Sequence, residues 1–298
     1  MLLRRVQAAT AAQRLCWLAT GLWIVQPFLL GPLLSDGLGG ASDSFSGIVT
    51  LASWLGWLGV LISLVARLPV TLAVARIGTA GTLPVAVWAA IESQDTTLAV
   101  IGIVGSLAVT AAVLAPGVAD SFIDGASYGD ERRFALRPPG PVLVVLVVPA
   151  WAVVIGGSTV GPILLADQRW LAGAVATVIG VPLAALAFNA LYRLTGRFIV
   201  LVPNGLVLHD RTVLREPVLF ARREIVGLGP ADADTSATDL TASALGLALE
   251  LKLHSTVTLP LVTGRKTTHE RQVRSLLISP SRPADVMRHA NQRGINIA

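Results

Sequence analysis

The sequence predicts a membrane α-helical bundle of six transmembrane helices, followed by a small cytoplasmic β-rich domain with a C-terminal helix. Hydrophobic residues make up 53% of the chain, above the roughly 45–50% apolar share of an ordinary soluble domain. Long apolar runs recur up to residue 192, and each is close to the roughly 20 residues that cross a bilayer. All but the third are uncharged. After residue 197 the apolar pattern changes to short alternating runs, and all 4 histidines lie in this last part.

Each span is predicted from an apolar run that ends at polar or charged residues. The predicted spans are residues 15–34, 45–66, 68–91, 98–119, 142–166 and 170–192. The third contains Arg76, whose charge costs about 2.5–3.5 kcal/mol at the bilayer centre. We therefore expect Arg76 near the cytoplasmic end of its helix, where its flexible side chain reaches the membrane surface.

The arginines between the spans predict how the chain is oriented. Cytoplasmic loops of membrane proteins carry an excess of Lys and Arg. With both termini in the cytoplasm, Arg169 is the arginine outside, and the cytoplasmic arginines up to residue 197 are Arg4, Arg5, Arg14, Arg67, Arg76, Arg132, Arg133, Arg137, Arg193 and Arg197. We predict a multi-pass protein of the cell (plasma) membrane, with N- and C-termini cytoplasmic.

Composition divides the chain into four regions. Proline, glycine and charged residues interrupt the apolar period in the second of them, which predicts a linker. The regions are a four-span transmembrane region (1–119), a cytoplasmic linker (120–141), a transmembrane hairpin (142–195) and a cytoplasmic domain (196–298). Small residues four apart (Ala172, Ala176, Gly180 and Ala184, and in the fourth span Gly102, Ser106 and Thr110) predict close helix contacts. Contacts within the chain are the favoured use, and contacts between subunits are the alternative.

The cytoplasmic tail has the pattern of a small curved sheet or barrel. Strands are predicted at residues 198–202, 206–209, 217–221, 224–228, 245–253, 257–262 and 274–279. Asn204-Gly205 is a two-residue turn signal, and Ser255-Thr256 is read as a second turn. Leucines at every second position of 245–253 predict one buried sheet face. A helix at 283–293 is expected to turn Val286 and Ala290 towards the sheet.

These features resemble bacterial membrane proteins in which a two-span unit leads into a pleckstrin-homology-like (PH-like) domain. The resemblance covers roughly residues 140–298 and rests on RFIVLVPNGLVLHD at 197–210, RREIVG at 222–227, the leucine-alternating strand and RPADV at 282–286. The residue usage is similar to that of uncharacterised actinobacterial membrane proteins. The resemblance implies a PH-like fold for the tail and a binding role, not a catalytic one.

Three common catalytic and nucleotide-binding motifs are missing from the sequence. It has no His-Glu-x-x-His, no Gly-x-x-x-x-Gly-Lys loop and no Gly-x-Gly-x-x-Gly fingerprint. The single cysteine, Cys16, lies in the first span and is read as a packing residue. We expect no enzyme activity, no catalytic residue, no metal ion and no cofactor.

Basic side chains of the tail form the best candidate site. Arginine and lysine near a membrane attract anionic headgroups, each charge contributing about 1 kcal/mol. The candidates for lipid or partner binding are Arg193, Arg197, Arg222, Arg223, Arg265, Lys266, Arg271 and Arg274. An ordinary solvated surface is the other reading of the same residues. Nucleic acid is not expected as a partner, because no aromatic residues alternate with these charges.

The leading hypothesis is a non-catalytic scaffold or adaptor. It presents a PH-like domain at the cytoplasmic face, where the domain binds anionic membrane lipids, a protein partner or another copy of itself. The alternative is a small transporter or transporter subunit that uses Arg76 and the proline-interrupted spans. An intramembrane enzyme is the third possibility.

Overall fold

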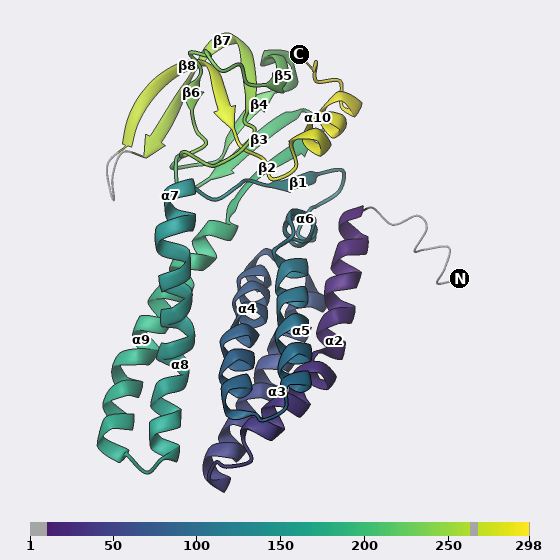
Figure 1. The fold of residues 1–298 in the computed structure, drawn as a ribbon. Helices are drawn as coiled ribbons and strands as arrows, with labels where there is room; N and C mark the ends of the chain where they lie inside the picture. Colours follow the sequence, from purple (N-terminus) through teal and green to yellow (C-terminus); the bar gives the residue numbers. More distant parts are fainter. Residues whose placement is uncertain (1–10, 263–267, 298) are drawn as a thin grey trace. The chain divides into compact units, whose positions relative to one another are not determined.

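The computed structural model describes residues 11–262 and 268–297 of the chain (Figure 1). Of the residues singled out in the sequence, Arg4, Arg5, Arg265 and Lys266 lie outside the described part. The chain forms two compact units, and each is described by itself. The helical unit consists of Met1–Phe122 and Pro149–Leu191, and the β unit consists of Ile123–Val148 and Tyr192–Ala298.

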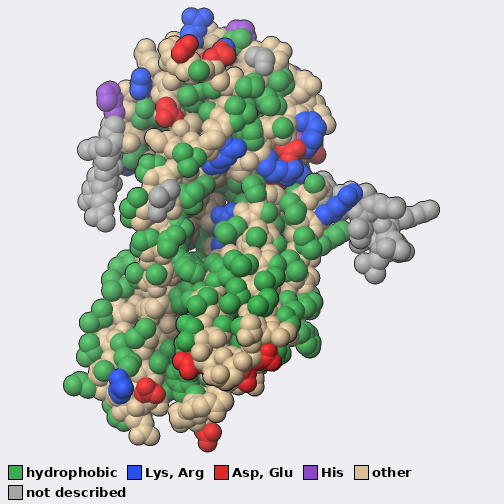
Figure 2. Space-filling view, viewed as in Figure 1, with side chains coloured by type: hydrophobic (Ala, Val, Ile, Leu, Met, Phe, Trp, Pro, Cys, Tyr) green, Lys and Arg blue, Asp and Glu red, His purple; other side chains and the backbone are tan. Residues whose placement is uncertain are grey.

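Within the described residues, six helical segments are long and apolar enough to cross a membrane, as the sequence predicts. They are α2 (Ala11–Gly37), α3 (Asp43–Ala66), α4 (Pro69–Glu92), α5 (Thr96–Leu114), the continuous run of α7 (Gly140–Val142), π-helical η1 (Leu143–Val147) and α8 (Val148–Ala166), and α9 (Trp170–Thr195). Hydrophobic side chains cover most of the helical surface visible in Figure 2. This is the surface expected of a multi-pass membrane protein.

The fourth span ends earlier than residue 119. Helix α5 stops at Leu114, and a separate short helix, α6 (Pro116–Asp124), follows it. Proline has no N–H group and disfavours helical backbone at the residue before it. Ala115 accordingly leaves the helix with a ψ of 136°. The prediction was wrong here because it followed hydrophobicity alone across Pro116.

Small residues let the helices of the helical unit approach closely. A Cβ atom added to Gly102 of α5 would lie 2.6 Å from a methyl carbon of Leu33 in α2. On the same pair of helices, Gln26 Nε2 donates a hydrogen bond to Ser106 Oγ at 3.0 Å. The small residues of the fourth span are therefore used for helix packing within the chain, as predicted.

The hairpin of α8 and α9 also packs through small residues. A Cβ atom on Gly157 of α8 would lie 2.5 Å from the carbonyl oxygen of Gly180 and 3.2 Å from Cβ of Ala184. Gly180 and Ala184 thus form the contact that their spacing predicts. Nearer the start of α9 the contact shifts to Gly173, which is buried, whereas Ala172 is exposed.

The described part of the β unit contains two four-stranded sheets and a C-terminal helix, α10 (Pro283–Gln292). The first sheet is antiparallel, in the order β1 (Arg132–Ala135), β2 (Arg197–Val202), β3 (Gly205–Asp210), β4 (Val218–Ala221). The second has the order β5 (Ile225–Pro230), β7 (Leu249–Val262), β8 (Thr268–Ile278), β6 (Thr238–Asp239), with the short β6 parallel to β8. A 3₁₀ turn, η2 (Arg222–Glu224), joins β4 to β5.

One apolar core holds the two sheets and α10 together. Phe134, Ile199, Phe220 and Leu251 belong to it, and Val286 and Ala290 of α10 face it with 0% exposure, as predicted. Isolated bridges join the two sheets, between Leu136 and Pro280 and between Leu214 and Leu261.

The segment predicted as a linker contributes a strand to this unit. β1 pairs with β2 from Arg132 opposite Leu201 to Ala135 opposite Phe198, and Phe134 is 3% exposed in the shared core. The hairpin is therefore an insertion between two neighbouring strands, and the β unit begins before the hairpin rather than at residue 196. Four residues with two arginines give too short an apolar pattern to predict a strand.

The leucine-rich strand differs from its prediction at both ends. β7 begins at Leu249, so Leu245 and Leu247 lie outside it and are exposed. The strand then continues to Val262 without a turn at Ser255-Thr256. Instead, residues 253–256 form a bulge opposite Arg274, between the pairs Lys252–Ser275 and Val257–Val273. Bulges bend a strand, so the strand curves at the position where the sequence predicted a turn.

The hairpin between β2 and β3 turns one residue earlier than predicted. Val202 pairs with Gly205, so Pro203 and Asn204 form the two-residue turn. Gly205 has a φ of +155°, and a Cβ atom on it would lie 2.1 Å from the carbonyl oxygen of Phe220. Glycine is needed here because of the approach of β4 rather than to make the turn.

Candidate functional site

The β unit holds both ends of the helical hairpin at one end of its first sheet, where β1 stops and β2 starts. α9 ends at Thr195 and β2 begins at Arg197, with Gly196 between them. On the other side, Leu136 N–H donates to Arg197 O at 3.0 Å, and the chain then enters α7 at Gly140. We call this region the junction end, defined by Arg137, Gly140, Gly196, Arg197 and Asp210.

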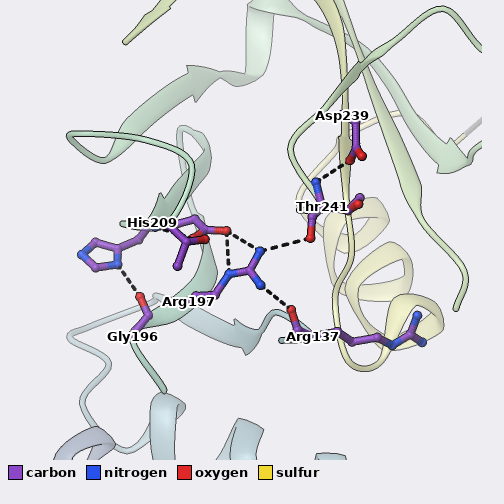
Figure 3. A network of polar contacts seen from close by, with 8 residues as sticks. Arg137, Gly196, Arg197, His209, Asp239 and Thr241 are labelled. Carbon is purple, nitrogen blue, oxygen red and sulfur yellow. Dashed lines mark hydrogen bonds and ion pairs between the residues drawn. The ribbon is translucent and has the colours of Figure 1, made fainter. Parts of the chain in front are cut away.

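A buried ion pair is the centre of the junction end (Figure 3). The Arg197 side chain is 1% exposed and that of Asp210 is 0% exposed. Arg197 Nε and Nη2 each lie 2.8 Å from Asp210 Oδ2. Arg197 Nη1 donates to Arg137 O at 2.8 Å, and Nη2 donates to Thr241 O at 3.3 Å. The pair thus connects the strand after the hairpin with the residue that precedes it.

Hydrogen bonds satisfy the rest of this network. The second oxygen of Asp210 accepts from the Thr212 hydroxyl at 2.6 Å and from its N–H at 3.0 Å. Thr241 N–H donates to Asp239 Oδ1 at 2.7 Å. A buried ion pair offsets its desolvation cost when its remaining polar atoms are bonded in this way. The arrangement holds the chain in place, and burial keeps Arg197 and Asp210 away from a ligand.

An aromatic stack lies next to the ion pair. The rings of Phe198 and His209 are cross-strand neighbours, 4.4 Å apart between centroids and 9° from parallel. The guanidinium of Arg133, from β1, lies 5.7 Å from the centroid of the Phe198 ring. His209 Nδ1 is 3.0 Å from Gly196 O, the residue between α9 and β2. Side chains of β1, β2 and β3 therefore brace the point where the hairpin returns.

Arg197 is buried, so its proposed role in lipid or partner binding has to be corrected. Sequence reasoning placed it at the surface because it follows a span directly. The position of the two-residue turn at Pro203 and Asn204 could have indicated this burial. It sets the register of β2 and β3 so that Arg197 lies opposite Asp210. A cross-strand Arg–Asp pair could have been predicted from that register.

Exposed arginines gather at the opposite end of the first sheet, which we call the far end. It consists of the β2–β3 turn and η2, where Arg222 N–H donates to Asn204 O at 2.7 Å. Arg222 and Arg223 are both exposed. The Arg222 guanidinium donates to Arg293 O at 3.3 Å, which brings a third arginine to this end. Sequence reasoning missed Arg293 because it is 71 residues further along the chain.

The second sheet adds exposed basic groups beside η2. Ile225, which follows η2, pairs with Leu253 at the start of the β7 bulge. Lys252, His254 and Arg274 are exposed around this bulge. Arg274 faces the bulge from β8, two strands from β5, or roughly 10 Å at the usual strand spacing.

The other predicted residues do not join this group. Arg271 is exposed on β8, and Arg193 is exposed in the last turn of α9. From Arg197 at the start of β2 to its end at Val202, the sheet extends roughly 17 Å at about 3.3 Å per residue. The predicted basic set is thus divided between the junction end, the far end and β8.

In the helical unit, Arg76 lies in α4, inside the third span. Within the described residues, its Nε atom is buried and has no hydrogen-bond partner. The nearby Thr79 hydroxyl donates to Ala75 O at 2.8 Å, and Thr79 O accepts from the Thr110 hydroxyl of α5 at 3.0 Å. Arg76 is therefore next to a polar contact between two helices.

The described residues contain no group of three or more His, Cys, Asp or Glu side chains that could hold a metal ion. Comparisons with known protein families, curated proteins and solved structures give no match.

Proposed function

We propose that this chain is a non-catalytic, multi-pass membrane protein that presents its β unit at the cytoplasmic face as a scaffold or adaptor. One observation carries the proposal. The hairpin is inserted between β1 and β2, and Arg197, which is held by its buried pair with Asp210, bonds to Arg137 O on the other side of the insertion. Because no long linker joins the β unit to the hairpin, the β unit stays close to the membrane surface.

The charge distribution supports the cytoplasmic side. Arginines are concentrated in the connections that the β unit shares, including Arg132, Arg133 and Arg137, whereas Arg169 lies in the opposite connection. The positive-inside rule then favours the cytoplasm for the β unit.

A PH-like fold is compatible with the shape of this unit. Two largely antiparallel sheets share one core, and a C-terminal helix packs against it through Val286 and Ala290. β1 is an addition to the expected pattern, since it comes from the chain before the hairpin.

Of the ligands considered, the far end suits an acidic protein partner. Arg222 and Arg223 are exposed there, at the opposite end of β2 from the residues that enter the hairpin, and Arg274 is exposed on β8 of the second sheet. Anionic lipid is the ligand for basic groups near the hairpin, such as Arg193. Charged groups on a binding surface steer the encounter and select the partner.

The test is a pair of charge reversals in the full chain, compared by crosslinking in native membranes. Arg222→Glu with Arg223→Glu should weaken the main protein crosslink on the order of tenfold, which is about 1.4 kcal/mol. Arg193→Glu is the matched control and should leave that crosslink unchanged while reducing the retention of anionic lipid. An equal loss from both variants, or no loss from the double variant, would refute a protein site at the far end.

A small transporter is the second candidate, and Arg76 is the observation that favours it. A buried guanidinium nitrogen inside a span, with no partner among the residues that the structure describes, is the kind of group that marks a substrate path. Arg76→Leu should then abolish flux in vesicles while the protein still assembles, and Arg76→Lys should retain part of the flux. A scaffold would show a change in stability alone.

A further inference from the structure

The loop before β7, residues 242–247, exposes two leucines that the sequence pattern assigned to the core. Leu245 is 66% exposed and Leu247 is 47% exposed, whereas Leu249, Leu251 and Leu253 of the same alternation are buried. We call residues 242–247 the leucine loop. Two leucines exposed this close together form an apolar site, and burial of that site in lipid or against protein would be favourable.

The leucine loop lies against the start of the fifth span. Gly140 N–H donates to Ser243 O at 3.1 Å. A Cβ atom on Gly140 would lie 2.7 Å from that oxygen and 3.1 Å from Cγ of Leu245. Gly140 is the first residue of the segment Gly140–Ala166, which is long and apolar enough to cross a membrane. The loop is thus placed where the chain leaves the β unit for the bilayer.

The loop is held in an unusual conformation, which argues against chance exposure. Ala242, Ser243 and Gly246 have φ values of 54°, 58° and 100°, in the region that side chains disfavour. Arg137 Nη1 donates to Leu245 O at 3.2 Å and to Leu247 O at 3.1 Å. One arginine, three residues before the span, therefore fixes the backbone of both leucines.

The residues that follow Gly140 indicate what covers the leucines. Leu143, Val145 and Leu146, in the first turns of the span and in the same compact unit, are 43%, 62% and 57% exposed. An apolar helix surface of this kind is covered by lipid. The leucine loop contacts Gly140, the residue at which this span begins.

We propose that the leucine loop inserts Leu245 and Leu247 into the interfacial layer of the leaflet from which the fifth span departs, and so anchors the β unit to the membrane surface. Arg137, which holds the loop, lies at the depth where arginine side chains meet headgroups. The anchor requires neither the basic far end nor a particular side of the membrane, so it is independent of the scaffold function.

The test uses the full chain in lipid nanodiscs, with Cys16→Ala and one new cysteine per variant. An environment-sensitive fluorophore is attached at Leu245→Cys, at Leu247→Cys, and at Leu219→Cys of β4 as the matched control, since Leu219 is 53% exposed. Emission at 245 and 247 should be shifted to the blue, quenched by lipids with a nitroxide near the headgroup and protected from iodide. Emission at 219 should show the opposite pattern.

A label at Leu146→Cys, inside the span, separates this proposal from the membrane assignment itself. Quenching at 146 without quenching at 245 or 247 would overturn the anchor and leave the span intact. A blue shift that depends on protein density rather than on nitroxide lipid would identify a second copy as the cover and would also overturn it.

The unaltered chain provides a second measurement that does not depend on variants. A lipid with a diazirine near its headgroup should crosslink to the peptide that contains residues 245–247 and not to the one that contains residue 219. Equal labelling of the two peptides would refute the insertion.

Discussion

Arg197 and Asp210 are the residues on which the junction end depends. The guanidinium satisfies two backbone carbonyl oxygens besides the carboxylate, and the carboxylate accepts two hydrogen bonds from Thr212. Because both side chains are buried, removing one partner leaves an uncompensated charge in the core. That loss is larger than the net contribution of the pair itself.

Arg197→Leu should therefore destabilise the β unit by about 3–5 kcal/mol, because Asp210 is left buried without its partner. Replacing both, as Arg197→Leu with Asp210→Leu, should recover much of this loss. Thermal unfolding of the full chain in detergent, followed by circular dichroism of the β signal, measures both.

Arg223→Ala, at an exposed arginine, is the control and should change stability by no more than about 0.5 kcal/mol. A single variant no less stable than the double variant would contradict the buried-charge explanation.

These residues also show which parts of the candidate site can be predicted from the sequence. Arg197 was recognised as important from its place after a span, but its role was misread because burial depends on register. Arg293 and Arg222 meet only after the chain has folded, with 70 residues between them. The exposed candidates at Arg222, Arg223 and Arg274 could be predicted, since charge favours the surface.

At the scale of elements, long uncharged runs predict the helices well, because a membrane span must satisfy its backbone within itself. β1 could not be predicted, because its partner strand follows the inserted hairpin, and its two arginines obscure the apolar side chains of Phe134 and Leu136. β7 was predicted in part, since alternation specifies a buried face but not where the strand begins.

Removing β1 should cost the β unit much of its stability. The fragment 196–298 lacks Phe134 and Leu136, which are 3% and 6% exposed in the core. Joining residues 128–137 to 196–298 by a short turn should restore about 3 kcal/mol or more, the usual cost of losing one large core side chain. Urea unfolding of the two fragments tests this.

A matched fragment with Phe134→Ala should behave like the fragment without β1. If all three unfold at the same urea concentration, β1 is not part of the core.

Two neighbouring glycines of α8 test the packing of the hairpin. Gly157→Ala should weaken it, because a Cβ atom there would lie 2.5 Å from Gly180 O. Gly156→Ala should be neutral or slightly stabilising, since nothing lies within 4 Å of its position and alanine is the better helix former. Steric trapping in bicelles measures the difference, expected at about 1–3 kcal/mol.

Equal effects at Gly156 and Gly157 would show that the two helices do not pack through this contact.

For the whole molecule, the side of the membrane on which the β unit lies decides between functions. A reporter that is active only in the cytoplasm should be active when it is fused after residue 298. A reporter that is active only outside the cytoplasm should be active when it is fused after Asp95 or Arg169. The physical reason is the unequal distribution of arginine between the two sets of connections. An extracytoplasmic C-terminus would exclude the scaffold function and would leave the leucine-loop anchor untouched.

The strand before the hairpin has a consequence for how the protein is made. When β1 leaves the ribosome, the strand that it pairs with has not been translated, and two helices must first pass into the bilayer. β1 therefore waits, with its backbone unpaired, until synthesis reaches residue 202. Completion of the first sheet therefore requires that the hairpin has first passed across the membrane and back.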